Sequence, residues 1–170
     1  MMHEGCVLAL IGKASDAVER ITAGVAAWRS TGSVAFVPWS LSNLTRAYAE
    51  LGQFDYAWRS IDEALTAIET TKERWCEAEV HRTAGEIALK SPRPDAPSAE
   101  AHFERALALA RAQHAKSWEL RAAMSMARLW RNQGKRNEAC DLLALVYNWF
   151  TEGFDTVDLK EAKALLDELG

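Results

Sequence analysis

The sequence predicts an all-α protein built as a stack of antiparallel helix pairs, and two observations support this prediction. The first is composition: the 170 residues include only four prolines and nine glycines, whereas good helix formers such as alanine, leucine, glutamate and arginine are abundant. The second is an internal repeat of about 40 residues, in which small and bulky positions return in register. Repeats of this length are typical of helical solenoids, whose units pack only on their neighbours.

The repeat is clearest between Pro38 and Thr71. Apolar residues recur there every three or four positions, first in one helix and, after a very short turn, in a second. Gly52 separates the two helices, because glycine takes the left-handed conformation of a helix C-cap without steric cost. The residues that set the pattern are Leu41, Leu44, Thr45, Tyr48, Gly52, Ala57, Ile61 and Ala64. This order resembles the tetratricopeptide repeat (TPR), which implies a right-handed superhelical stack that serves as an interaction scaffold.

Equivalent positions recur along the whole chain. The small residue of the second helix returns as Ala17, Ala57, Ala99 and Ala139. The bulky residue four positions later is Ile21, Ile61, Phe103 and Leu143. A glycine stands five positions before the alanine in three units, at Gly12, Gly52 and Gly134. The register therefore predicts one elongated domain over residues 1–170.

Taken in order, the units are a truncated repeat over residues 1–30 and three fuller repeats over 34–72, 74–113 and 116–151. The first helix of the first unit is short, so we expect the chain to be a piece, or the continuation, of a longer protein. Ser15 is a plausible N-cap for the second helix of that unit.

The third repeat has a proline-rich turn over residues 91–97 where the other repeats have a glycine. Because proline cannot sit inside a helix, this segment predicts a rigid, lengthened turn. A last amphipathic helix over residues 157–169 is predicted to cap the stack. Asp158 and Glu161 have the spacing of a capping box at its start.

Aromatic residues mark the starts of three repeats. Phe36, Trp75 and Trp118 occupy the same place just before the first helix of each unit. We expect each ring to pack on the end of the second helix of the preceding repeat, and so to help set the stacking angle.

The C-terminal half carries a narrower resemblance. The segments 117–120, 127–130, 133–135, 147–156 and 158–169 resemble the C-terminal tail of large bacterial signalling regulators. In that family a class III nucleotide cyclase domain, an ATPase module and TPR-like repeats share one chain. The resemblance covers residues 34–170, and it implies a cytoplasmic signalling protein of which this is the C-terminal part. No cyclase or ATPase motif is present in these 170 residues, so neither activity carries over.

Charge and motifs argue against several other functions. The net charge of −4 disfavours a nucleic-acid binder, which is usually basic. The three cysteines, Cys6, Cys76 and Cys140, show neither zinc-ligand nor disulfide spacing, which suits a reducing, cytoplasmic setting. No phosphate-binding loop, catalytic arrangement or membrane segment is evident. The sequence thus predicts a non-enzymatic protein with no cofactor, no metal, no nucleic acid and no membrane contact.

The concave face of such a stack is lined by the first helix of each repeat, and its predicted residues are more basic than the chain as a whole. The groove residues predicted from the register are Trp39, Ser42, Asn43, Arg46, His81, Arg82, Arg121, Met124, Ser125 and Arg128. Arginine forks bind carboxylates in pairs of hydrogen bonds. We therefore predict that an acidic protein segment, which could be another domain of the same parent chain, binds in the groove.

Two alternatives stay open on the sequence. The arginines could be solvated, or paired with the nearby carboxylates of Glu50, Glu79, Glu86 and Glu119. The domain could also be a structural spacer or a self-association module with no groove ligand.

Overall fold

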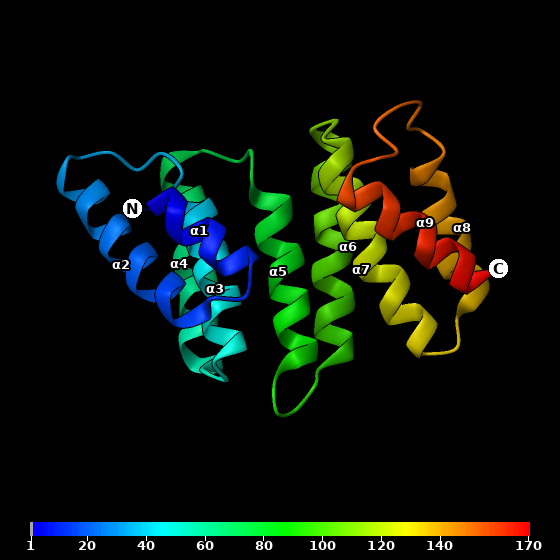
Figure 1. The fold of residues 1–170 in the computed structure, drawn as a ribbon, viewed down its shortest axis with the longest axis horizontal. Helices are drawn as coiled ribbons and strands as arrows, with labels where there is room; N and C mark the ends of the chain where they lie inside the picture. The colour runs from blue at the N-terminus through cyan, green and yellow to red at the C-terminus, as the bar shows by residue number, and fades with distance from the viewer. Residues whose placement is uncertain (1) are drawn as a thin grey trace.

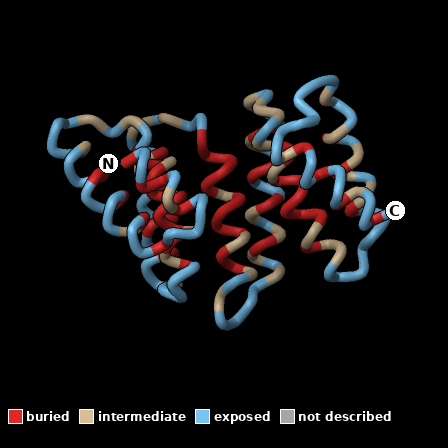
Figure 2. The backbone as a smooth tube through the Cα atoms, viewed as in Figure 1, coloured by how far each residue is buried: buried red, intermediate tan, exposed pale blue. Residues whose placement is uncertain are grey.

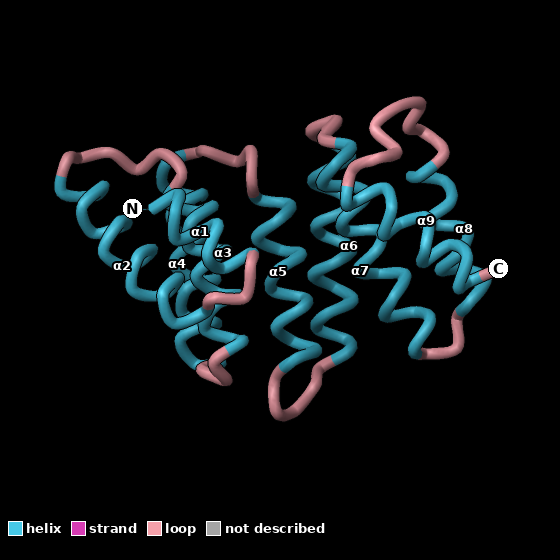
Figure 3. The backbone as a smooth tube through the Cα atoms, viewed as in Figure 1, coloured by secondary structure: helices cyan, strands magenta, loops and turns pink. Residues whose placement is uncertain are grey.

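In the computed structural model, which describes residues 2–170, the regular secondary structure is entirely helical (Figure 1, Figure 3). The described residues form nine helices: α1 (Met2–Leu10), α2 (Ala14–Ser30), α3 (Val37–Glu50), α4 (Phe54–Thr71), α5 (Glu77–Lys90), α6 (Ala96–Ala112), α7 (Lys116–Asn132), α8 (Arg136–Tyr147) and α9 (Val157–Leu169). The predicted all-α fold class is confirmed.

The helices pair into four hairpins, and the hairpins stack into an elongated superhelix with the two termini toward opposite ends (Figure 1). The first helices contact one another in the order α1, α3, α5, α7 and α9. In the described backbone, the second helices α2, α4, α6 and α8 contact only their neighbours in sequence. The stack is therefore tighter along the odd-numbered helices, which places these helices on the concave side.

The small positions of the repeat lie where the two helices of a hairpin approach most closely. Ala17, Ala57, Ala99 and Ala139 are all fully buried, as the register predicts. Gly85 on α5 shows the same constraint, because a Cβ atom there would lie 2.5 Å from the ring of Phe103 on α6. Small side chains are thus required for the close packing of the helices.

Three of the hairpin turns contain a glycine in the left-handed region, with φ values of 77°, 72° and 82° at Gly12, Gly52 and Gly134. The turn between α5 and α6 is built differently. It covers residues 91–95, and Asp95 caps α6 by accepting a hydrogen bond of 2.9 Å from the backbone N–H of Ser98. Pro97 lies inside the first turn of α6, where a missing N–H is tolerated. The predicted turn over 91–97 was therefore two residues too long.

Two predicted caps are wrong. Helix α2 begins at Ala14, so Ser15 lies inside it and makes no capping hydrogen bond. Helix α9 begins after Thr156, which places Asp158 and Glu161 within the helix. Their carboxylates bind arginines on α7.

Buried residues lie along the inner faces of the helices (Figure 2). The apolar core that they form is divided into two main clusters. One cluster joins α1 to α5 around Ile21, Leu41 and Ile61, and the other joins α5 to α9 around Phe103 and Leu143. Trp58 on α4 packs against both clusters and against a small third one. The two halves are therefore joined by Trp58 and by α5, which contributes buried residues to both main clusters.

The aromatic residues at the repeat starts form a continuous row across the repeats. The ring of Phe36 lies 5.7 Å from that of Trp75, which lies 5.9 Å from Trp39. Trp39 in turn lies 5.6 Å from Trp118 on α7. Trp39 belongs to α3, Phe36 is the N-cap of that helix, and Trp75 lies in the turn before α5. Trp118 lies inside α7, and not just before it as the sequence predicted. The ring contacts thus connect the starts of successive repeats.

Removal of the capping helix tests its role in stability. Leu159, Leu165 and Leu169 are buried on α9, and each buried leucine contributes roughly 1.5–3 kcal/mol. A chain that ends at Asp155 should lose several kcal/mol of unfolding free energy in urea denaturation. A melting temperature within about two degrees of the intact chain, with no self-association, would contradict this. Among the aromatic residues between α8 and α9, Phe150 packs against the same core cluster as these leucines. Trp149 and Phe154 are 57% and 47% exposed, so they contribute little to it.

Candidate partner-binding groove

The concave side holds a hollow of about 860 Å³, lined by residues from α1, α3, α5, α7 and α9. Its basic residues are Arg46, Arg82, Lys90, Arg121 and Arg128, and its acidic residues are Glu50, Glu86, Asp158 and Glu161. Its apolar residues are Ala9, Leu10, Trp39, Trp118, Met124 and Val157. The groove is thus amphipathic, with charges of both signs close together.

Of the ten predicted groove residues, six line this hollow: Trp39, Arg46, Arg82, Arg121, Met124 and Arg128. The other four do not. Ser42 and Ser125 are buried and hydrogen-bonded to Thr83 and Glu86, respectively. Asn43 is buried, and its side-chain amide donates a hydrogen bond to the carbonyl of Trp39 in its own helix. His81 packs against His102 on α6. The register thus brings the four arginines and one tryptophan together on one face.

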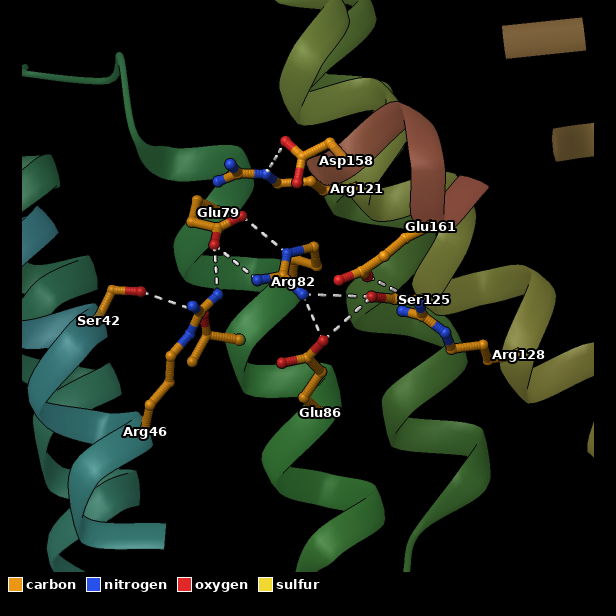
Figure 4. Close-up of polar contacts among 11 residues, drawn as sticks. Ser42, Arg46, Glu79, Arg82, Glu86, Arg121, Ser125, Arg128, Asp158 and Glu161 are labelled. Carbon is orange, nitrogen blue, oxygen red and sulfur yellow. Dashed lines mark hydrogen bonds and ion pairs between the residues drawn. The ribbon is translucent and has the colours of Figure 1, made fainter. Parts of the chain in front are cut away.

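The inner part of the groove is a buried ion-pair network that joins three helices (Figure 4). The carboxylate of Glu79 on α5 is almost fully buried and accepts hydrogen bonds from Arg46 on α3 and from Arg82, at 2.5 and 2.6 Å. Arg82 also pairs with Glu86 and donates to the hydroxyl of Ser125 on α7. That hydroxyl donates onward to Glu86 at 3.2 Å. The network therefore fixes the relative positions of α3, α5 and α7.

The protonation states in this network follow from the pairing. Burial alone would raise the pKa of Glu79, but the adjacent guanidinium groups of Arg82 and Arg46 outweigh it and lower that pKa. Burial lowers the pKa of Arg46, against the opposing effect of Glu79. The carboxylates of Glu79 and Glu86 raise the pKa of Arg82 above its usual value, against the opposing effect of burial. All three groups stay charged near neutral pH.

The outer part of the groove is formed between α7 and the capping helix. Arg121 donates a 2.7 Å hydrogen bond to Asp158, and Arg128 donates one of 3.2 Å to Glu161 (Figure 4). These pairs are half-exposed, in contrast to the Glu79 network. Arg121 also lies over the ring of Trp118, 5.2 Å from its centroid. The contact between Trp39 and Trp118 spans from α3 to α7 and borders the hollow.

The structure shows that all four predicted groove arginines are paired with carboxylates. Glu79 and Glu86 are two of the four partners considered from the sequence. Glu119 instead binds Arg111 and Lys116, and Glu50 lines the groove without an ion pair to any described residue. The register could not reveal Asp158 and Glu161 as partners, because their spacing was interpreted as a capping box. Trp118 was also missed as a groove residue, although its distance from Arg121 is one helical turn.

His81 on α5 and His102 on α6 form a second polar contact, outside the groove. Their Nδ1 atoms lie 3.2 Å apart, between α5 and α6, and the ring of Trp58 packs on His102 at 6.2 Å. Burial lowers the pKa of His81 to about 4, and repulsion from Arg105, and from His102 when that ring is protonated, lowers it further. Burial also lowers the pKa of His102. Both rings are therefore neutral at pH 7.

Comparison with known proteins identifies the fold. No family model and no curated protein matches the sequence. Two similar crystal structures are of the nearly identical TPR-like repeats of a Podospora anserina protein assigned as a kinesin light chain, one of them with a glutamine-to-methionine substitution. Each is 19% identical and covers 99% of this chain and 82% of its own, with TM-scores of 0.69 and 0.68.

The chain has the TPR-like fold. Among residues 2–170, no three or more His, Cys, Asp or Glu side chains gather as a metal site would require. No helix in this range is long and apolar enough to cross a bilayer.

The histidine pair predicts a pH dependence of stability. An unfolded histidine has a pKa of about 6.5, so between pH 6.5 and about 4 the unfolded chain binds more protons than the folded one. The unfolding free energy should therefore fall as the pH decreases through this window. Buried carboxylates with lowered pKa values, such as that of Glu79, lose their contribution only below their unfolded pKa of about 4.3.

We expect His81→Gln to reduce the change in unfolding free energy between pH 7 and pH 5, measured by urea denaturation at both values. His3→Gln is the matched control, because it removes one exposed histidine without touching the contact between His81 and His102. An identical pH dependence in wild type and His81→Gln would contradict the assignment.

Proposed function

We propose that this TPR-like domain is a non-catalytic scaffold whose concave groove binds a carboxylate-bearing segment of a protein partner. The observation that carries the proposal is the meeting of four arginines and two tryptophans in one hollow of about 860 Å³. Tryptophan and arginine are among the residues most enriched at interface positions with large binding energies. The amphipathic lining suits a segment with one apolar and one acidic face, as in helix-in-groove recognition.

The two parts of the groove have different roles in this proposal. Arg46 and Arg82 are held by Glu79, so they shape the inner wall and present little free charge. Arg121 and Arg128 lie in half-exposed pairs, where a ligand carboxylate can reach them. Trp39 and Trp118 offer apolar surface beside them. The segment would therefore bind chiefly along α7, with its apolar face toward the tryptophans.

We further propose that the domain belongs to the C-terminal part of a cytoplasmic bacterial signalling protein. This proposal rests on the sequence resemblance of residues 117–169 to the regulators that combine a cyclase domain, an ATPase module and TPR-like repeats. In such a protein, the ligand could be an acidic segment of another domain of the same parent chain.

Self-association is the second candidate, and exposed apolar residues at the two ends of the stack favour it. Val7 and Ile11 are exposed in the first hairpin, and Leu145 and Trp149 are exposed in and just after α8. Apolar surface of this kind often marks contacts between proteins. Light scattering across a concentration series would show a dimer or a higher oligomer if the ends associate.

A display selection with random peptides tests the groove proposal. The peptides would be selected on the immobilised chain, and the enriched sequences tested on Arg121→Gln/Arg128→Gln. We expect enriched peptides to combine acidic and large apolar residues and to lose at least about tenfold in affinity on this variant. The control is Arg131→Gln, because Arg131 pairs with Glu168 between the same two helices but outside the groove.

Equal binding to the wild type and the double variant would rule out the groove as the binding site. Failure to enrich any peptide, together with concentration-dependent light scattering, would favour the self-association module.

A further inference from the structure

The carboxylates that pair with the outer groove arginines come from the capping helix. Asp158 and Glu161 lie three positions apart on α9, and they bind Arg121 and Arg128, which lie seven positions apart on α7 (Figure 4). All four side chains line the hollow. The groove of the isolated chain thus already holds two acidic side chains on its exposed arginines.

These two pairs differ from the Glu79 network in how readily they can be broken. The side chains of Arg121 and Asp158 are 35% and 29% exposed, and those of Arg128 and Glu161 are 43% and 53% exposed. Half-exposed pairs of this kind are weak, and water can solvate each partner when the pair opens. The side chain of Glu79 is only 1% exposed, so water could not solvate its carboxylate if its ion pairs opened.

Opening the pairs does not require α9 to leave the stack. The helix is held by the buried side chains of Leu159, Leu165 and Leu169. Arg136 on α8 also donates hydrogen bonds to the carbonyls of Glu168 and Leu169 at its C-terminal end. Asp158 and Glu161 can therefore turn toward solvent by side-chain rotation alone.

Building on the groove function proposed above, we infer that Asp158 and Glu161 act as a built-in competitor for the ligand carboxylates. A partner segment binds by exchanging its own carboxylates for theirs on Arg121 and Arg128. The internal pair also shows which ligand spacing satisfies both arginines: two acidic residues three positions apart on a helix. The partner is accordingly an amphipathic helix with an Asp-x-x-Glu pair beside apolar residues that meet Trp118, Met124 and the exposed Val157.

The exchange has two consequences for recognition. The competitor lowers affinity, because each ligand carboxylate replaces an existing ion pair instead of meeting a free arginine. It also raises selectivity, because a neutral segment that displaced Asp158 and Glu161 would leave two arginines without partners. Because the number of ion pairs is unchanged by exchange, binding should depend only weakly on salt.

The test compares two double variants of the full chain by fluorescence anisotropy. The probe is a fluorescein-labelled amphipathic peptide of about 16 residues, roughly 24 Å long if helical, with one Asp-x-x-Glu pair. In Asp158→Asn/Glu161→Gln the competitor is neutral. We expect this variant to bind the probe about three- to tenfold more tightly than the wild type, because the ligand carboxylates no longer have to displace two weak, exposed ion pairs. Its affinity should also fall more steeply as salt rises from about 50 to 300 mM.

The matched control is Asp167→Asn/Glu168→Gln. It changes the net charge by the same amount on the same helix, and it also removes two exposed ion pairs, with Lys163 and Arg131, outside the hollow. We expect it to bind the probe as the wild type does. A second probe, with Asn and Gln in place of the acidic pair, should bind all variants weakly.

The outcomes separate this inference from the groove function. Equal affinity and equal salt dependence for the wild type and Asp158→Asn/Glu161→Gln would overturn the exchange and leave the groove function standing, provided that Arg121→Gln/Arg128→Gln still loses binding. An equal gain in the control variant would mean that net charge alone acts, which also overturns it. No binding of the acidic probe to any variant would overturn both proposals.

Discussion

The buried carboxylate of Glu79 is the interaction on which the arrangement of the inner helices depends. It lies on α5, the helix that contributes buried residues to both main apolar clusters. Its guanidinium partners come from α3 and α5, and Arg82 carries the network on to Ser125 of α7. Three successive repeats are thereby connected at one point on the concave side.

Such a network need not increase net stability. Removing two charges from water is costly, and well-packed apolar residues of similar volume often stabilise a protein as much. Breaking the network is different, because an unpaired carboxylate would remain in a buried site. Its clearest physical effect is to favour one relative placement of α3, α5 and α7. A groove that is ordered before binding loses less conformational entropy when a ligand arrives.

The ion pairs in the outer half of the groove are exposed, in contrast to the buried Glu79 network. The pairs of Arg121 and Arg128 with α9 are exposed enough to be exchanged, and Arg121 lies against the ring of Trp118 in the aromatic row. A fixed inner wall and an exchangeable outer wall together give a site that holds its shape yet admits a charged ligand. The capping helix thus has two roles, since its leucines close the core while its first turns supply carboxylates to the groove.

The repeat register was enough to predict much of this molecule. The buried positions of Ala57 and Ala139, the left-handed glycines at Gly52 and Gly134, and the shared face of the four arginines all follow from local periodicity. The ionic partners do not follow from it. Arg121 and Asp158 are 37 positions apart, and periodicity shows which way a side chain faces but not which side chain of another helix meets it.

The same limit explains the missed roles of Asp158 and Trp118. The spacing of Asp158 and Glu161 fits a capping box and a pair of groove ligands equally well, and only the position of the helix start separates the two. Trp118 contacts Trp39 across an intervening repeat, a contact that depends on the curvature of the whole stack.

A double-mutant cycle on Arg46 and Glu79 tests most directly whether this ion pair connects the repeats. Arg46→Met, Glu79→Gln and the double variant would be compared with the wild type by urea denaturation at pH 7. We expect a coupling free energy of about 2 kcal/mol or more, because each single change leaves the other group with fewer partners in a buried site. Effects that add to within about 0.5 kcal/mol would contradict the central role of Glu79.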